Sequence, residues 1–444
     1  MAAPTLQDGI DRAGSPLALL WKPGAGPWTP EVIEDEYAGW RREQQSWHSG
    51  ATIMDLSHHM SDTVFEGSDV TRLLSEVSAN NYEKFAVGQA KQFIPVAADG
   101  NIVTDGILLK ETEERYVLSG VAAAQNWVRF HAGRSGHDVS SSTDPNSSVR
   151  GGGDPKTFRY QIQGPLARDL VERVFGGPLP EVRFFHSSIL SLDGRPVRAL
   201  RHGMAGQDGY EFIGAWNDAA AVKETFLRVG EEFGLVHVGA WAYPTASLES
   251  GWIPSPLPAI YTAPELAEYR QFVGLYSYEG QNALHGTYVS ERIEDYYASP
   301  FELGYGRSIS LGHDFTGRDA LIAAKQEPLR RKVTLVVDPA DVAAVPTFRD
   351  DFVLNYGRNR IEAGDELAGM TYYAGSVDPV GTVLALALVD ERFATPGTEV
   401  TLVWGEHPGV GTPDREVPEF TRLRATVRPA PYDEYARSQY RADA

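Results

Sequence analysis

The sequence predicts an α+β protein of three domains, and two patterns carry this prediction. The first 240 residues hold two successive units with a similar order of strands and helices, as in a pseudo-repeat, although their sequence identity is negligible. From Leu329 onward the pattern changes to short strands, such as 332–337, 381–389 and 399–404, which indicates a separate all-β module, a small barrel or jelly roll. A chain of 444 residues is long enough for two to four domains. We therefore place the domains at 1–155, 156–328 and 329–444.

The first of these ranges begins with a helical extension. Pro30 opens a run to Tyr37 whose first turn is acidic, as the N-terminus of a helix favours. The other elements expected up to residue 155 are mixed strand at 51–66, a capped helix at 68–77, a hairpin at 93–110 with its turn at Asp99-Gly100-Asn101, a strand at 116–119, a helix at 122–132 and a mobile Ser/Gly-rich loop at 134–154.

The second range repeats the alternation and then becomes irregular. The expected elements are a strand at 158–163, a helix at 166–175, a strand pair at 184–200, a loop at 203–209, a strand at 210–212 and an amphipathic helix at 218–233. The stretch from Gly251 to Pro258 holds three prolines, which remove backbone donors and restrict their neighbours. It is therefore expected to be an irregular insertion.

Charge and composition exclude several classes of protein. A formal net charge of −20 disfavours nucleic-acid binding and docking on an anionic membrane, both of which need a concentrated basic surface. The chain has no cysteine, so disulfides, thiolate nucleophiles and iron–sulfur clusters are excluded. Neither a signal peptide nor a long apolar span is evident, and we expect a cytoplasmic enzyme.

The adjacent histidines His58 and His59 are candidates for metal binding or catalysis. On a strand they would point to opposite faces and could not chelate one ion together, and no further ligand pattern accompanies them. We therefore predict no metal site. A structural role and a catalytic role for one of the two histidines, which titrate near neutral pH, both stay open.

Two carboxylates stand in strand-like surroundings. Glu211 lies between Tyr210 and Phe212 and, by alternation, faces away from both rings, where it could accept two N–H donors of a pterin-like ring. Asp105 precedes the apolar run Ile107–Leu109, where a carboxylate must be either paired or functional. A surface position for Glu211 and a purely structural pairing for Asp105 are the alternatives.

Six segments, in this order along the chain, resemble the motifs of glycine-cleavage aminomethyltransferases (T-proteins). They are Ala51–Met60 (ATIMDLSHHM), Ile102–Leu108 (IVTDGIL), Tyr160–Ala167 (YQIQGPLA), Gly209–Glu211 (GYE), Leu248–Gly251 (LESG) and Gly317–Leu321 (GRDAL). The resemblance implies three domains, two αβ and one β-barrel or jelly-roll-like, around a central folate channel. It also implies tetrahydrofolate as the cofactor.

A closer likeness is to the tetrahydrofolate-dependent aryl O-demethylases of the vanillate and syringate type. It is carried by Arg201–Gly206, Ala242–Pro244, Leu248–Thr262, Ile293–Tyr297 and Glu302–Gly306. The resemblance implies transfer of an ether carbon from an aromatic ring to tetrahydrofolate, leaving a phenol or catechol. The implied partners are thus a small aromatic substrate and tetrahydrofolate, with no nucleic acid and no membrane.

Departures from that group bear on the substrate. The vanillate enzymes have an arginine where this chain has Val121, a tyrosine near Pro30 or Trp28, and a basic residue at Trp241. Valine cannot pair with a carboxylate, and an unpaired buried carboxylate is unfavourable. We therefore expect a neutral substrate, first a methylenedioxybenzene such as the lignan sesamin, giving a catechol and 5,10-methylenetetrahydrofolate. The alternative is a methoxyarene, guaiacol- or vanillate-like, giving 5-methyltetrahydrofolate.

Cleavage of an aryl ether needs an acid near the ether oxygen, which suggests roles for residues of this chain, although Tyr243 could instead be a core tyrosine that bonds the Trp252 loop. Tyr243 is the first candidate for the acid at the ether oxygen and His58 or His59 the second, whereas Asp105 favours positive charge on the pterin. The pterin would be held by Gln163, Glu211, Tyr210 and Trp252. The substrate pocket would be formed by Trp28, Leu56, Met60, Phe93, Ser119, Val121 and Trp241.

Overall fold

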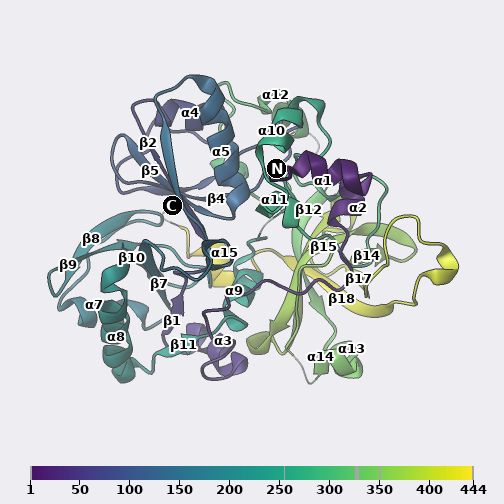
Figure 1. Ribbon diagram of the computed structural model, residues 1–444. Helices are drawn as coiled ribbons and strands as arrows, with labels where there is room; N and C mark the ends of the chain where they lie inside the picture. The colour runs from purple at the N-terminus through teal and green to yellow at the C-terminus, as the bar shows by residue number, and fades with distance from the viewer. Residues whose placement is uncertain (1–2, 255, 326–329, 350–351, 443–444) are drawn as a thin grey trace.

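Figure 1 shows the computed structural model, which describes residues 3–254, 256–325, 330–349 and 352–442. The described residues form three β-sheets with helices packed against them. In the view of Figure 1, a five-stranded sheet lies at the upper left, a six-stranded sheet at the lower left and a β-barrel at the right. The predicted α+β class is confirmed.

The six-stranded sheet combines strands from distant parts of the chain. In spatial order its strands are β11 (Val236–Val238), β1 (Thr52–Asp55), β7 (Thr157–Gln163), β10 (Gly209–Ala215), β9 (Arg195–Leu200) and β8 (Ser187–Leu192). Helices α7 (Ala167–Phe175) and α8 (Ala219–Gly230) pack on its apolar face. Phe158, Tyr160 and Ile162 of β7 belong to that core, so the alternating residues of β7 face the opposite side.

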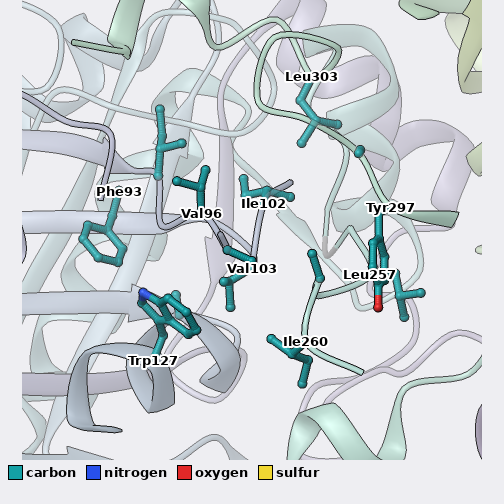
Figure 2. Close-up of a cluster of buried hydrophobic side chains, with 14 of the residues drawn as sticks. Phe93, Val96, Ile102, Val103, Trp127, Leu257, Ile260, Tyr297 and Leu303 are labelled. Carbon is teal, nitrogen blue, oxygen red and sulfur yellow. The ribbon is translucent and has the colours of Figure 1, made fainter. Parts of the chain in front are cut away.

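The five-stranded sheet is antiparallel throughout. Its strands in order are β3 (Ala90–Phe93), β4 (Gly106–Lys110), β5 (Arg115–Gly120), β2 (Ser61–Glu66) and β6 (Ser140–Asp144). Helices α4 (Val70–Glu76) and α5 (Ala122–Ser135) cover one face. The core beneath them contains Phe93 and Trp127, together with Val96, Ile102 and Val103 from the hairpin turn (Figure 2).

The two sheets are interleaved along the chain. Strand β1 precedes the whole five-stranded sheet in sequence but pairs with β7 and β11 of the other sheet. The expected limit at residue 155 therefore separates β1 from its partners, and the expected limit at residues 328 and 329 lies outside the described residues. The three sequence ranges stay a prediction about domains, whereas the sheets follow a different division of the chain.

The C-terminal strands close into a barrel. Neighbouring strands are β15 (Glu366–Val377), β14 (Arg360–Ala363), β17 (Glu399–Trp404), β18 (Thr421–Pro429), β12 (Arg330–Val337) and β16 (Thr382–Asp390), with β13 (Leu354–Asn355) added to β15. Pairing of β16 with β15 completes the ring. The interior is filled by apolar side chains such as Leu335, Ala385 and Leu402. This closed six-stranded barrel confirms the predicted all-β module.

Further helices join these parts. They are α1 (Leu6–Ala13), α2 (Pro16–Leu20), α3 (Trp40–Ser49), α6 (Ser147–Arg150), α9 (Ala242–Ser250), α10 (Ala267–Phe272), α11 (Tyr278–Gln281), α12 (Arg318–Ala324), α13 (Pro339–Ala344), α14 (Pro346–Arg349) and α15 (Glu434–Ser438). Short 3-10 helices cover 216–218, 231–233, 264–266, 293–296, 306–308, 378–380, 391–393 and 414–416. The proline-rich stretch 251–258 is irregular as expected, apart from residue 255, which is outside the described residues.

The helix predicted from Pro30 to Tyr37 is wrong. The structure has turns and bends there, and the helix α3 begins only at Trp40. The carbonyls of Glu34 and Asp35 accept hydrogen bonds from residues 240 and 241, and the Glu43 side chain accepts from the amides of Tyr37 and residue 38. Residues distant in sequence thus form the hydrogen bonds with these backbone groups that a local helix would otherwise form.

The loop predicted at 134–154 is also wrong. Its Ser/Thr-rich centre forms the edge strand β6, which pairs with β2 from Asp62 to Glu66, and α6 follows. An exposed edge strand carries polar side chains, as a loop does, so the composition of this segment does not distinguish the two. Two smaller differences concern the site. His58 and His59 lie in the turn after β1, and Asp105 lies directly before β4, so none of the three is within a strand.

Within the described residues, no helix combines the length and the apolar character needed to cross a lipid bilayer.

Candidate functional site

A small cavity lies where the segment before α3 meets the end of β1 and the start of α9. Its walls are formed by Trp28, Pro30, Ile33, Met54, Asp55, Leu56, His59, Val238, Gly239, Ala240, Tyr243 and Pro244. Its volume of about 10 Å³ is roughly the space of one water molecule. An aromatic ring therefore enters only if part of this wall moves outward. Trp28 is the most exposed large apolar side chain of the wall, at 41%.

Three aromatic side chains meet at this cavity. The His59 ring lies 5.6 Å from the Trp28 ring and 5.2 Å from the Tyr243 ring, to which it stands nearly perpendicular. Trp28 is held in place by a 2.6 Å hydrogen bond from its indole nitrogen to the Ser148 hydroxyl of α6. Among the described residues, the Tyr243 hydroxyl has no hydrogen-bond partner. It is therefore available to a ligand.

The protonation of these groups limits what they can do. Loss of solvation lowers the pKa of His59 to about 4 and also lowers the pKa of His58, so both rings are neutral at pH 7. Burial, helped by the charge of Glu211, raises the pKa of Tyr243 above its usual 10. Neither histidine is then the proton donor expected at the ether oxygen. Tyr243 stays protonated and can donate a hydrogen bond.

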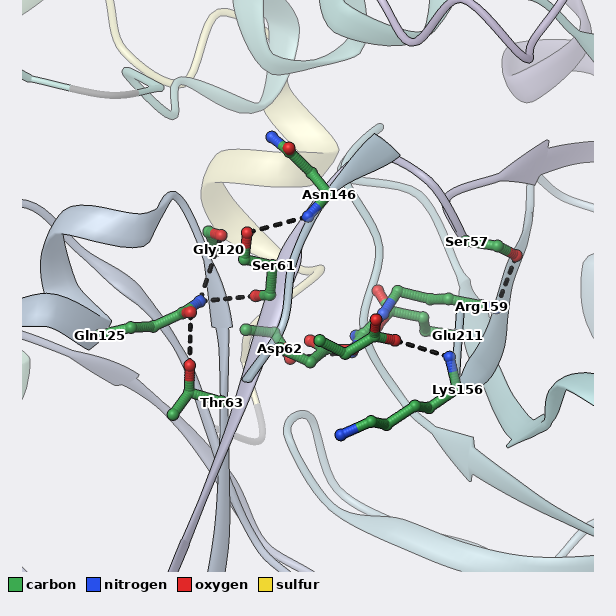
Figure 3. A network of polar contacts seen from close by, with 12 residues as sticks. Ser57, Ser61, Asp62, Thr63, Gly120, Gln125, Asn146, Lys156, Arg159 and Glu211 are labelled. Carbon is green, nitrogen blue, oxygen red and sulfur yellow. Dashed lines mark hydrogen bonds and ion pairs between the residues drawn. The ribbon is translucent and has the colours of Figure 1, made fainter. Parts of the chain in front are cut away.

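Arg159 ties the two αβ sheets together behind the cavity. It projects from the polar face of β7 and forms an ion pair with Glu211 of β10 (Figure 3). Its other nitrogen lies 3.1 Å from Asp62 of β2 and donates a 2.8 Å hydrogen bond to Ser119 of β5. Arg159 and Glu211 are both almost fully buried. One guanidinium thus holds side chains from three other strands.

Glu211 is ionised in these surroundings. Burial alone would raise the pKa of Glu211, but the charge of Arg159 and the hydrogen bond with His202, 3.4 Å away, lower it to about 2. Tyr210 lies on the other face of β10, with its ring in the apolar core under α7 and α8. The predicted opposite orientation of Glu211 and Tyr210 is confirmed. The same orientation contradicts the prediction that Tyr210 holds the pterin, because its ring faces away from Glu211.

Two glutamines of β7 share the polar face with Arg159. Gln163 is engaged by the loop before β10, donating 2.8 Å to the Gln207 carbonyl and accepting 2.8 Å from the Ala205 amide. Gln161 accepts 3.1 Å from the Met204 amide, but its buried Nε2 has no partner among the described residues. Buried donors are nearly always paired. The unpaired Nε2 of Gln161 is therefore a better candidate ligand contact than Gln163.

Asp105 is the centre of a second polar cluster. Its Oδ2 accepts hydrogen bonds from the Trp252 indole at 2.8 Å, the Gln92 amide at 2.6 Å and the Tyr305 hydroxyl at 2.9 Å. Burial raises the pKa of Asp105, and these donors only partly oppose the effect. Its Oδ1 has no hydrogen-bond partner among the described residues. Asp105 is thus paired on one oxygen and open on the other.

The other predicted pocket residues divide into two groups. Leu56 lines the cavity and Met60 lines a second hollow beside it, while Ser119 contacts Arg159. Phe93 is instead buried in the core of the five-stranded sheet, because its strand presents it to α5 (Figure 2). Phe93 lines neither of the two described hollows, and its place in the pocket stays a prediction.

Trp241 and Val121 also lie apart from the described hollows. The Trp241 ring stacks on Phe352 at 5.6 Å, on the side of the barrel. Val121 is the N-cap residue of α5 and lines neither of the two hollows. The apolar wall expected from Val121 is therefore supplied by other residues, chiefly Ile33 and Leu56.

The sequence interpretation missed Arg159 and Gln161. Residues 159, 161 and 163 alternate along β7, the strand that ends in the Gln-Gly-Pro motif. Since every second side chain of a strand points to the same face, alternation alone would have placed all three on one face. The partners of Arg159 come from residues 62, 119 and 211, and no local pattern shows that these meet.

Comparison with known proteins agrees with this arrangement. The family described as "GCVT N-terminal domain" matches residues 24–255, just over half of the chain. The chain is 35% identical to a syringate O-demethylase from Sphingobium sp. (strain NBRC 103272 / SYK-6), covering 99% of this chain and 98% of the relative. It is 27% identical to a sesamin methylene transferase from Sinomonas sp. (strain No.22), covering 89% of each.

A solved structure is similar over nearly the whole chain. It is the glycine cleavage system aminomethyltransferase T from Bartonella henselae, with a TM-score of 0.64, 18% identity and 96% coverage of both chains. At this identity the likeness concerns the fold. Two αβ sheets and a terminal barrel are thus an arrangement already seen in a protein of known structure.

Proposed function

Since the chain belongs to the aminomethyltransferase family and is a tetrahydrofolate-dependent one-carbon transferase, we propose that it demethylates a methoxyarene. The observation that carries this proposal is the 35% identity to a syringate O-demethylase, which extends over 99% of the chain. The products would be a phenol or catechol and methylated tetrahydrofolate. A cytoplasmic location and a small aromatic substrate are parts of the same proposal.

The polar groups around Glu211 and around Asp105 offer the contacts that a pterin ring needs. A pterin presents adjacent N–H donors and a carbonyl acceptor, and a site for it needs the complementary groups. Gln161 offers an unpaired Nε2 donor, while the open Oδ1 of Asp105 and the ionised Glu211 offer acceptors. The indole of Trp252, fixed by its bond to Asp105, offers a ring for stacking. These four residues are the ones we assign to the cofactor.

The remaining groups suit cleavage of an aryl ether. Bound tetrahydrofolate supplies the nitrogen that accepts the carbon. The bond between the methyl carbon and the ring oxygen breaks, and its electron pair stays on the oxygen. We assign Tyr243 to donate a hydrogen bond to that oxygen; its raised pKa makes it a weaker acid than a free phenol, so it stabilises the phenolate without giving up its proton. The proton displaced from the accepting nitrogen would pass to solvent, and the phenolate would take up one proton on release, so that charge and protons balance.

His59 has a positioning role in this scheme. Neutral at pH 7, it packs between Trp28 and Tyr243 and fixes both rings. Asp105 would favour the positive charge that develops beside it during transfer, because an opposite charge at short range is stabilising in a dry site. Once a ring is bound, the apolar side chains of the cavity wall would keep bulk water from the reacting oxygen.

A methylenedioxybenzene is the second candidate substrate. It is favoured by the apolar wall of Ile33, Met54, Leu56 and Val238 and by the relative that acts on sesamin. The carbon moved would then be a methylene group, and the aromatic product would be a catechol.

One experiment separates these candidates. The full chain is incubated with tetrahydrofolate and, separately, with syringate, vanillate or sesamin carrying ¹³C at the ether carbon, and the label is followed by NMR. We expect label to move from a methoxy donor, and only when tetrahydrofolate is present. If label moved from sesamin and not from syringate or vanillate, the substrate would be a methylenedioxybenzene and the group transferred a methylene. No transfer from any aryl ether would overturn the proposal.

A further inference from the structure

The segment 433–440, which contains α15, packs against the loop 203–209 that leads into β10. Figure 1 shows α15 in the middle of the molecule, beside α9. The amide of Asp433 donates 3.1 Å to the carbonyl of Glu249 in α9. A Cβ atom on Gly206 of the loop would lie 2.7 Å from the Cβ of Ala436. The segment is thus fixed to α9 and in close contact with the loop.

Tyr440 is the most deeply buried side chain that follows α15 among the described residues. It is 2% exposed, and its ring lies 5.2 Å from the Phe184 ring in an edge-to-face arrangement. Its hydroxyl donates a 3.0 Å hydrogen bond to the carbonyl of Gly203. A buried tyrosine hydroxyl needs a polar partner, and here that partner is the loop that contacts the glutamines of β7.

One peptide group connects Tyr440 to Gln161. The carbonyl of Gly203 and the amide of Met204 belong to the same planar unit. The carbonyl accepts from Tyr440, and the amide donates 3.1 Å to Oε1 of Gln161. Because the unit is planar, it cannot turn at one end without turning at the other. The hydroxyl of Tyr440 thus holds this peptide group in the orientation that Gln161 contacts.

The amide of Met204 determines which atom of the Gln161 side chain is open to a ligand. A glutamine side chain carries an acceptor oxygen and a donor nitrogen, and its orientation follows from its hydrogen bonds. With Oε1 bonded to Met204, Nε2 is the buried donor that has no partner among the described residues. If the peptide group turned, the side chain could rotate and present its oxygen instead. The carbonyl of a pterin would then meet an acceptor in place of a donor.

The loop has little room for another arrangement. A Cβ atom on Gly203 would overlap the side-chain amide of Gln163. Gln163 accepts 2.8 Å from the Ala205 amide and donates 2.8 Å to the Gln207 carbonyl. The loop is thus in contact with β7 through Gln163 and with the segment 433–440 through Gly206 and Gly203.

We propose that Tyr440 is a positioning residue for tetrahydrofolate. It fixes the peptide group between Gly203 and Met204, and through this group it keeps Nε2 of Gln161 available to the pterin. This inference rests on the assignment of Gln161 to the cofactor under the proposed function. It holds for transfer of a methyl or of a methylene group, because both use the same bound cofactor. Cofactor binding is therefore tested apart from ether cleavage.

The test is an anaerobic fluorescence titration of the full chain with tetrahydrofolate. Tyr440→Phe keeps the ring and removes the hydroxyl, and its Kd should rise about three- to tenfold, as expected for the loss of one buried hydrogen bond. The matched control is Tyr160→Phe. Tyr160 is also 2% exposed, and its hydroxyl donates 3.0 Å to the Ala219 carbonyl of α8, on the other face of β7. The Kd of this control should stay within about twofold of the wild type.

Two further measurements separate positioning from a general loss of stability. In a Gln161→Ala background, Tyr440→Phe should raise the Kd by less than about twofold, because the side chain that it positions is absent. Hydrogen exchange followed by mass spectrometry should become faster in the loop 203–209 of Tyr440→Phe and stay unchanged there in Tyr160→Phe.

The outcomes that overturn the role of Tyr440 are distinct from those that overturn the proposed function. An unchanged Kd in Tyr440→Phe, an equal rise in Tyr160→Phe, or the same rise with and without Gln161 would each refute the positioning role. The titration needs no aryl ether. If no ether is cleaved but the Kd depends on Tyr440 and Gln161 as expected, the proposed function fails and the positioning role stands. If an ether is cleaved and the Kd does not depend on Tyr440, the positioning role fails and the proposed function stands.

Discussion

The ion pair between Arg159 and Glu211 makes a quantitative prediction about stability. Replacing Glu211 by glutamine keeps the shape of the side chain but removes its charge, and leaves Arg159 with Asp62 and Ser119 alone. The pKa of Glu211 falls from 4.5 to about 2 on folding. By linkage, this difference corresponds to a stabilisation on the order of 3 kcal/mol at neutral pH.

The dependence on pH has a definite sign. A carboxyl group whose pKa is lowered by folding stabilises the folded state fully above its unfolded pKa, here 4.5, and loses that contribution as the pH falls toward about 2. Glu211→Gln should therefore lower the free energy of unfolding by about 3 kcal/mol at pH 7 and by about 2 kcal/mol at pH 3.5. The variant and the wild type converge as the pH approaches 2.

Urea unfolding followed by tryptophan fluorescence, from pH 7 down to pH 3.5, measures both quantities. The matched control is Glu268→Gln, which breaks an exposed ion pair with Arg134 and should change stability by less than about 1 kcal/mol at every pH. A difference between Glu211→Gln and wild type that is below about 1 kcal/mol, or that does not shrink with falling pH, would refute the reasoning.

Three further predictions concern the site. Tyr243→Phe should lower kcat about 100-fold with little change in KM, because the lost hydrogen bond stabilises the leaving oxygen; a variant that keeps more than about half the turnover contradicts this role. Gln161→Ala should raise the Kd for tetrahydrofolate about tenfold in a fluorescence titration, while thermal unfolding shows no loss beyond that of a small cavity. Since the pKa of His59 is about 4, the plot of kcat against pH should show no titration of a histidine between pH 5.5 and 8, and kcat should fall only as the pH approaches 4. A titration near pH 6.5 that disappears in His59→Asn would contradict a neutral His59.

Local patterns predicted most elements of the fold. The helix at 122–132, the hairpin at 93–110 and the strands of the barrel each follow from spacing and turn chemistry. The two wrong segments, 30–37 and 134–154, each have a composition typical of another structure. Their actual structure is determined by hydrogen bonds to distant partners, residues 240 and 241 for the first segment and β2 for the second. The secondary-structure propensity of a segment contains no information about such distant partners.

The site was predicted unevenly for the same reason. Glu211 and Asp105 were found because each stands in a short motif that carries its own signal. Their partners could not be found, since Arg159 meets residues from three other strands and Asp105 meets Trp252 and Tyr305 across the fold. Phe93, which the resemblance placed in the pocket, pairs with β4 and is buried in the core, so no local pattern tells which of the two surroundings it belongs to.

The position of β1 has a consequence for how the chain acquires its site. Thr52 pairs with Val236 across about 180 residues, so the strand that leads into His58 and His59 has no parallel neighbour until residue 238 has left the ribosome. Contacts of such sequence separation form slowly, because a long loop must close first. A chain of 155 residues holds every strand of the five-stranded sheet but neither of the strands that pair with β1. The turn that carries His58 and His59 is therefore expected to become ordered only when the six-stranded sheet assembles.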